Sequence, residues 1–183
     1  MRVSTNHPFQ HFVVVLSIVS TMAIGLGSCC QEVECAADGS MSTVEQLVLK
    51  EVNNARRQEN PQLPVLVPEC HAVHFARQHE KILADRGVPH TDFNIRADSI
   101  ATKQDLCEFK CVGEVAVGFS LPFGFTPQDL ADKAVLGWKN SDKHWKIITS
   151  QGNHGHYNSA GVAVTQDAAG IWFVTMILIQ KEL

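Results

Sequence analysis

The chain has 183 residues, of which 45% are hydrophobic and 19% are charged, a balance that suits a folded domain with its own core. Its 15 Lys and Arg residues face 19 Asp and Glu residues, so the formal net charge is −4 at pH 7. No cluster of basic residues stands out, which argues against nucleic-acid binding, a function that relies on concentrated positive charge.

Residues 1–28 have the pattern of a secretory signal peptide. Arg2 is their only charged residue, and residues 12–26 form an apolar core that small residues follow. This core is short for a membrane span, and no stop-transfer pattern comes after it. We therefore expect a secreted, extracellular protein with no transmembrane segment after signal removal, with a retained signal anchor as the alternative.

The end of this segment allows a second kind of processing. Leu26-Gly27-Ser28-Cys29 resembles the lipobox of bacterial lipoproteins, in which the cysteine carries lipid and becomes the new N-terminus. A membrane-anchored lipoprotein held through Cys29 is thus the alternative localisation. The sequence leaves both open, and we favour the soluble form.

All cysteines of the chain follow the signal core. An even number in an exported chain predicts up to three disulfides, although their connectivity does not follow from the sequence. A zinc site at Cys107 and Cys111 lacks a second matching pair, so disulfides are the better interpretation. The cysteines are Cys29, Cys30, Cys35, Cys70, Cys107 and Cys111.

Regular structure is expected to begin after an N-terminal arm at residues 29–41. Ser42 and Glu45 have the spacing of a capping box, and apolar residues then recur at helical spacing as far as the charged Arg56 and Arg57. The pattern predicts a first helix here, and residues 42–183 form one predicted domain.

A second helix is expected after a proline-rich break, with Pro68 in its first turn and Gly87 as its C-terminal stop. His71 and His74 also lie on it, but they have no carboxylate partner on the same helix face, so we interpret them as solvated or packed. The predicted inward stripe consists of Ala72, Phe75, Ala76, His79 and Leu83.

Residues 88–111 show no periodicity and are expected to form a long loop, and residues 112–119 form either a short strand or an irregular buried segment. The next residues place Phe119, Phe123 and Phe125 among Gly and Pro. We favour a loop folded onto the core, and the functional alternative is an apolar lip that binds lipid or a membrane.

The C-terminal third predicts helices followed by strands. Thr126, Pro127 and Asp129 mark a helix start, and a short helix carrying His144 is expected to follow. Residues 160–165 and 171–179 predict a hairpin whose second strand is nearly all apolar, as a central strand buried on both faces would be. Helices first and strands last predict an α+β fold, a sheet covered by helices.

The order of several short motifs resembles one known family. The chain contains His90-Thr91-Asp92, then Gly113-Glu114, then Trp138 followed by Asn140-Ser141 and His144, and finally a Gly-Val-Ala-Val strand at residues 161–164. This order is similar to that of the CAP superfamily (cysteine-rich secretory, antigen 5 and pathogenesis-related proteins), especially its microbial-type SCP domains. The likeness covers roughly residues 43–179.

The resemblance implies a three-layer α-β-α sandwich with a mainly antiparallel central sheet, and a cleft lined by His and Glu that binds a divalent metal in several members. His90, Glu114 and His144 match the family's site residues. Val115 replaces the usual Asn, and Ser141 stands where a second Glu is common. Two imidazoles and one carboxylate suit zinc or another divalent cation.

A competing match for the second His is His156 in the sequence Gly155-His156-Tyr157, but too few residues separate it from the next strand for the expected helix. His144 is therefore the better match. Another interpretation of His90 and Glu114 is that they only tie a loop to the helix of His144 by buried hydrogen bonds.

Three functions follow from this interpretation. The first is a monomeric, non-enzymatic binding module. Its ligand is a sterol or lipid, or its partner is an extracellular protein. Ser141 and the three phenylalanines are then the ligand-binding residues. The second is a metal-dependent hydrolase, such as a protease, in which Glu114, His90 and His144 act on a metal-bound water or Glu114 acts as general base. The third is a disulfide-stapled signalling or structural ligand with a vestigial pocket.

Overall fold

The computed structural model describes residues 40–86, 109–152 and 154–181. The predicted signal peptide, most of the arm at 29–41 and His90 lie outside these residues. The elements in chain order are α1 (Thr43–Glu59), β1 (Val67–Pro68), α2 (Cys70–Arg86), β2 (Phe109–Phe119), α4 (Pro127–Lys139), α5 (Asp142–Ile148), β3 (Ser159–Gln166) and β4 (Trp172–Lys181).

The strands form one mixed, mostly antiparallel sheet in the order β1-β3-β4-β2. β4 pairs antiparallel with both β3 and β2, whereas β1 pairs parallel with the start of β3. Residues 174–179 of β4 are all buried, as expected for a strand with neighbours on both sides and helices on both faces. The predicted hairpin and its central second strand are confirmed.

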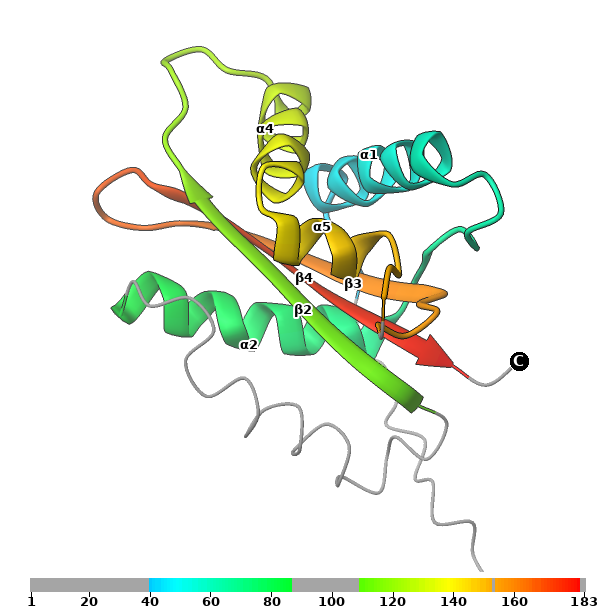
Figure 1. Cartoon of the computed structure of the whole chain (residues 1–183). Coiled ribbons are helices and arrows are strands. Elements are labelled where there is room, and N and C mark those ends of the chain that lie inside the picture. The colour runs from blue at the N-terminus through cyan, green and yellow to red at the C-terminus, as the bar shows by residue number, and fades with distance from the viewer. Residues whose placement is uncertain (1–39, 87–108, 153, 182–183) are drawn as a thin grey trace, which may run out of the picture.

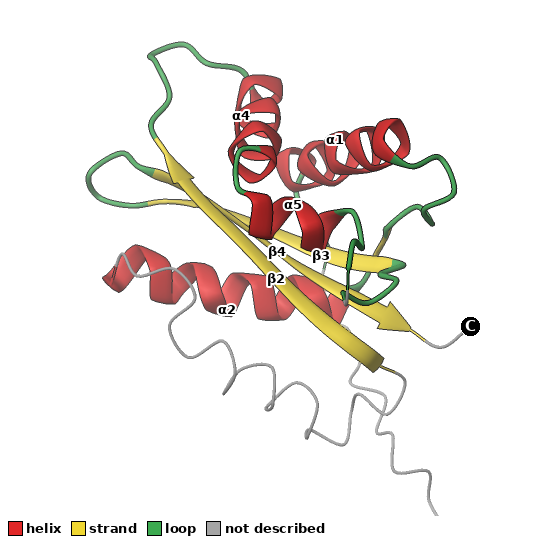
Figure 2. Cartoon of the chain, in the orientation of Figure 1, coloured by secondary structure: helices red, strands yellow, loops and turns green. Residues whose placement is uncertain are grey.

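Helices cover both faces of this sheet. Figure 1 and Figure 2 show α1, α4 and α5 on one face and α2 on the other. Because successive strand residues point to opposite faces, β4 divides its side chains between the two layers. Val174, Met176 and Leu178 pack with α1 and α4, whereas Ile177 and Ile179 pack against α2. The α-β-α sandwich and the α+β class are confirmed.

Local capping interactions explain where two helices begin. Ser42 and Glu45 form a capping box at the start of α1, in which the Ser42 N–H donates to Glu45 Oε2 at 2.6 Å. Thr126 and Asp129 form the same motif at the start of α4, with Pro127 in its first turn. These motifs satisfy N–H groups that have no partner within a helix, so both predicted starts are confirmed.

The prediction that Pro68 lies in the first turn of the second helix is wrong. Pro68 belongs to β1, and α2 begins at Cys70. The N–H groups of Val67 and Glu69 donate to carbonyls of the β3 segment at 3.1 and 3.0 Å, so the pairing does not need the N–H that proline lacks. Proline is therefore as acceptable in this short edge strand as in a helical turn.

Gly161 allows α2 to lie directly on the sheet. A Cβ at this position would lie only 2.0 Å from the Val73 nitrogen and 2.2 Å from the Ala72 carbonyl carbon. These are backbone atoms of α2, which cannot move aside without shifting the helix. Glycine at this position of β3 thus sets the distance between α2 and the sheet.

Arg56 is buried, although the sequence marks it only as a charged residue near a helix end. Its side chain is 1% exposed, and its guanidinium donates hydrogen bonds to the carbonyls of Ile148, Pro64 and Tyr157. Burial lowers the pKa of Arg56 from its usual value to about 10. One side chain thus joins α1 to the end of α5 and to the segments before β1 and β3.

Replacing Arg56 should therefore destabilise the fold strongly. We expect Arg56→Met to lower the free energy of unfolding by about 3 kcal/mol, because it removes the donor to the buried carbonyls of Ile148 and Tyr157 and to the carbonyl of Pro64. Arg57→Met is the matched control, since Arg57 is exposed and donates to Asn54 at 2.8 Å; it should stay within about 0.5 kcal/mol of the parent. Urea denaturation measures both, and equal losses would contradict the role of Arg56.

Candidate functional site

Glu114 lies on β2 and faces α2. It is directly opposite Ile177 of β4, and directly paired residues project on the same face of a sheet. Ile177 belongs to the cluster packed against α2, which places Glu114 in that layer. The carboxylate is buried, with 4% of the residue exposed.

The carboxylate of Glu114 has an ionisable neighbour on α2. His79 Nδ1 lies 3.3 Å from Glu114 Oε2, and the two side chains are 0% and 2% exposed. Thr175 Oγ1 lies 3.5 Å from the same nitrogen. This buried contact holds the Glu114 side chain against α2. The predicted inward position of His79 is confirmed, but its acidic partner was not foreseen.

Glu80, the next residue on α2, is a second buried acid. It is 3% exposed, and among the described residues neither carboxylate oxygen has a hydrogen-bond partner within ordinary distance and angle limits. Burial raises its pKa from 4.5 to about 9; nearby Glu45 adds to the rise, and Thr175 opposes it. The carboxyl group is therefore neutral at pH 7 in the folded protein.

Glu80 should make stability depend on pH. Its folded pKa lies above its unfolded value, so unfolding releases a proton and stability falls as pH rises from about 4.5 to 9. The slope for one proton is at most about 1.4 kcal/mol per pH unit. Glu80→Gln removes this titration, so the variant should become progressively more stable than the parent over this interval.

Thermal denaturation from pH 5 to 9 measures this difference. Glu59→Gln is the control, because Glu59 is exposed at the end of α1. It should leave the pH slope unchanged. If the Glu80→Gln variant and the parent had the same slope, Glu80 would have to titrate alike in the folded and unfolded states.

His144 lies on α5, on the opposite face of the sheet from α2. Ser141 is the N-cap of α5, one turn before His144, as the sequence predicts, and its side chain makes no capping hydrogen bond. Both residues are half-buried. His156 is exposed in the segment before β3, and its N–H donates to Gln180 Oε1 at 3.1 Å. No helix carries it, in agreement with the preference for His144.

The three predicted metal ligands are thus only partly placed. His90 lies outside the described residues, Glu114 faces α2, and His144 belongs to the other helical layer. Within the described part of the chain β2 is an edge strand of the sheet, so groups from the two faces can approach each other around this edge. The site at His90, Glu114 and His144 remains a prediction.

The phenylalanine segment lies between β2 and α4, and its three rings differ. Phe123 is fully exposed, whereas Phe119 and Phe125 pack against the core. Phe125 and Trp172 form an edge-to-face pair with ring centroids 5.3 Å apart. The favoured interpretation of a loop on the core describes the two half-buried rings, whereas the ring of Phe123 lies fully in solvent.

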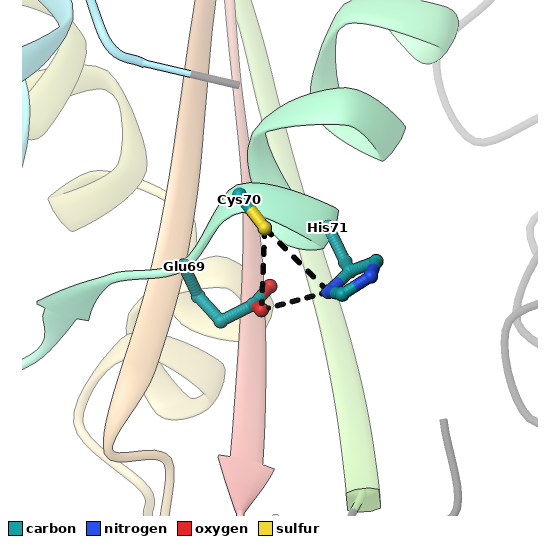
Figure 3. A group of neighbouring side chains, drawn as sticks. All are labelled: Glu69, Cys70 and His71. Carbon is teal, nitrogen blue, oxygen red and sulfur yellow. Dashed lines mark hydrogen bonds and ion pairs between the residues drawn. The ribbon is translucent and has the colours of Figure 1, made fainter. Parts of the chain in front are cut away.

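Three consecutive residues at the start of α2 bring different donor atoms together (Figure 3). His71 Nδ1 lies 2.9 Å from Glu69 Oε1, and Cys70 Sγ lies 3.7 Å from His71 Nδ1 and 3.9 Å from Glu69 Oε1. These atoms are of the types that bind zinc, and the group could hold a metal ion. Cys70 is disulfide-bonded in the structure, however, so its sulfur is not a thiolate ligand.

Glu69 also has a structural role. Its Oε2 accepts a hydrogen bond from the Ala72 N–H at 2.7 Å, which caps the start of α2. Its Oε1 lies 2.9 Å from His71 Nδ1 and 3.4 Å from Lys181 Nζ. His71 therefore has a carboxylate partner that the sequence analysis missed by looking only along the helix, whereas exposed His74 contacts Gln78.

The predicted disulfides are only partly placed. Cys70 is disulfide-bonded, which agrees with an oxidised exported chain. Cys29, Cys30, Cys35 and Cys107 lie outside the described residues, and so does the side chain of Cys111. The remaining pairing stays a prediction. Among the described residues, no helix is both long enough and apolar enough to cross a membrane.

No protein-family model and no curated protein matches the sequence. Solved structures do resemble it. An outer surface protein from Borrelia burgdorferi matches with a TM-score of 0.58 and 14% identity, over 78% of this chain and 96% of that one. An Ancylostoma-secreted protein matches with a TM-score of 0.51 and 10% identity, over 79% of this chain and 74% of that one. Both are CAP-family proteins, and at these identities they establish the fold alone.

Proposed function

Because the chain has the fold of CAP-family proteins, we propose that it is a secreted binding module rather than an enzyme. The observation that supports this most is the environment of Glu114, the acid that hydrolysis would require. Its carboxylate is buried and lies against His79, so it is held within the protein instead of being presented to a substrate. This arrangement suits a fixed ligand-binding group better than a general base, which must reach the proton it abstracts.

We further propose that His90, Glu114 and His144 hold a divalent cation where Glu114, which faces α2, and His144 on α5 approach each other around the β2 edge of the sheet. A carboxylate can bind a metal through one oxygen while a neighbouring side chain orients the other, and such supporting contacts strengthen metal binding. The contact between His79 and Glu114 Oε2 is of this kind. Three ligands with an open position for water suit zinc.

Zinc titration of the oxidised protein by calorimetry tests this proposal. The parent should bind one ion, and His90→Ala, Glu114→Gln and His144→Ala should each weaken binding at least about tenfold. His74→Ala is the matched control, since His74 is exposed on α2. Binding should disappear below about pH 6, where the imidazoles become protonated.

Equal affinity in the parent and in all three ligand variants would overturn the cleft assignment. Peptide cleavage that chelators abolish and that requires Glu114 would instead establish the hydrolase. The same purified proteins serve for both measurements.

We propose a lipid or sterol as the organic ligand class, because Phe123 exposes a whole aromatic ring at the tip of the loop before α4. Phe123→Ser should reduce co-sedimentation with sterol-containing phosphatidylcholine vesicles without changing the melting temperature. Phe125→Ser should instead lower the melting temperature, because Phe125 packs against Trp172. Leu136→Ser is the control, since Leu136 is a half-exposed apolar residue of α4; unchanged vesicle binding by Phe123→Ser would contradict the proposal.

A further inference from the structure

The donor atoms of Glu69, Cys70 and His71 are spaced for one zinc ion. Zinc bonds of about 2.0–2.3 Å in a tetrahedral arrangement require donor atoms roughly 3.4–3.6 Å apart. The observed separations are 2.9, 3.7 and 3.9 Å (Figure 3). Side-chain shifts of about half an ångström would therefore bring all three atoms to bonding distance, with the fourth position left to water.

The surroundings hold these side chains in place and allow an ion to reach them. The bond from the Ala72 N–H to Oε2 fixes the Glu69 carboxylate and leaves Oε1 directed at His71 and Cys70. Such a supporting contact orients a metal ligand. Glu69 and Cys70 line a cavity of about 630 Å³ next to α1, and the His71 side chain is 23% exposed.

Lys181 shows that a positive charge is already favourable at this point. Its ammonium lies 3.4 Å from Glu69 Oε1, the oxygen that would bind the ion. A zinc ion would take over this contact and displace Lys181. The lysine thus competes with a metal instead of contributing to the site.

Cys70 Sγ can bind zinc as a thiolate only when the disulfide at Cys70 is reduced. We propose that Glu69, Cys70 and His71 form a redox-gated zinc site, which binds one Zn²⁺ when the Cys70 disulfide is reduced and releases it on reoxidation. The site is distinct from the cleft of Glu114 and His144. It does not depend on the proposed function.

The gating step is a thiol–disulfide exchange. An external dithiol attacks the Cys70 disulfide, forms a mixed disulfide and then closes its own disulfide; two electrons and two protons pass to the protein, which gains two thiols. Zinc then binds the Cys70 thiolate, whose S–H proton passes to solvent, and His71 Nδ1, whose hydrogen moves to Nε2 so that the imidazole stays neutral. Oxidation of the two thiols by a disulfide compound reverses both steps and frees the ion.

Metal binding to oxidised and reduced full-length mature protein tests the proposal. The protein is reduced with a dithiol that gel filtration under argon then removes, and it is titrated with Co²⁺ by absorption spectroscopy and with Zn²⁺ by calorimetry. We expect the reduced protein to show a sulfur-to-cobalt charge-transfer band that the oxidised protein lacks. It should also bind one more zinc ion than the oxidised form.

The variants separate this site from other thiols released by reduction. Glu69→Gln, which retains an oxygen to cap α2, and His71→Asn should each weaken the additional binding at least about tenfold. Lys181→Gln should strengthen it by removing the competing charge. His74→Asn, an exposed histidine of the same helix, should leave it unchanged.

Three results would overturn the proposal. They are equal metal binding by the oxidised and reduced forms, equal binding by the His71→Asn variant and the parent, and loss of the helical circular dichroism signal on reduction, because the gate requires an intact α2. Zinc binding by the oxidised protein that is lost in Glu114→Gln reports on the cleft instead. The experiments therefore test the two proposed metal sites independently.

Discussion

The buried guanidinium of Arg56 is the interaction on which the arrangement of the helical layer of α1, α4 and α5 depends. Its partners are backbone carbonyls from three segments, which lie 8, 92 and 101 residues further along the chain. A charge placed in the interior is costly unless hydrogen bonds satisfy it, so these segments must converge on α1 for the fold to be stable. Two of them bear on the predicted site. Ile148 ends α5, the helix of His144, and Tyr157 packs where Gly113 precedes Glu114.

Local signals explain why much of the fold could be predicted from the sequence. Capping boxes, Pro127 in a first turn and a hairpin with one wholly apolar strand act within a few residues and led to the correct elements, whereas the same proline signal at Pro68 did not. β1 could not be foreseen, because two residues become a strand only through pairing with a segment about 90 residues later. Arg56 was missed for the same reason, since a charged residue near a helix end is normally exposed.

Long-range contacts also limited the prediction of the site. Glu114 was identified by its motif and His79 by its place on an inward stripe, but only the folding of α2 onto β2 shows that they meet. Glu69 was missed because it precedes the helix, and its pairing with His71 depends on the cap it forms with Ala72. Spacing along a chain identifies ligands that share one element, whereas ligands from different elements must be found in three dimensions.

The two helical layers differ in the ionisable side chains that they bury, and this difference indicates which layer contains the candidate site. The layer of α1, α4 and α5 joins an apolar core in which backbone carbonyls accept the hydrogen bonds of the Arg56 guanidinium. The α2 layer buries His79, Glu80 and Glu114 together, and in the described part of the chain Glu80 lacks a hydrogen-bond partner within ordinary limits. Buried acids lower stability unless they are paired, so a helix optimised for stability alone would carry apolar residues here. Buried ionisable groups that lower the stability of the fold are typical of binding and catalytic sites. Both candidate metal sites have ligands on α2 or on segments next to it.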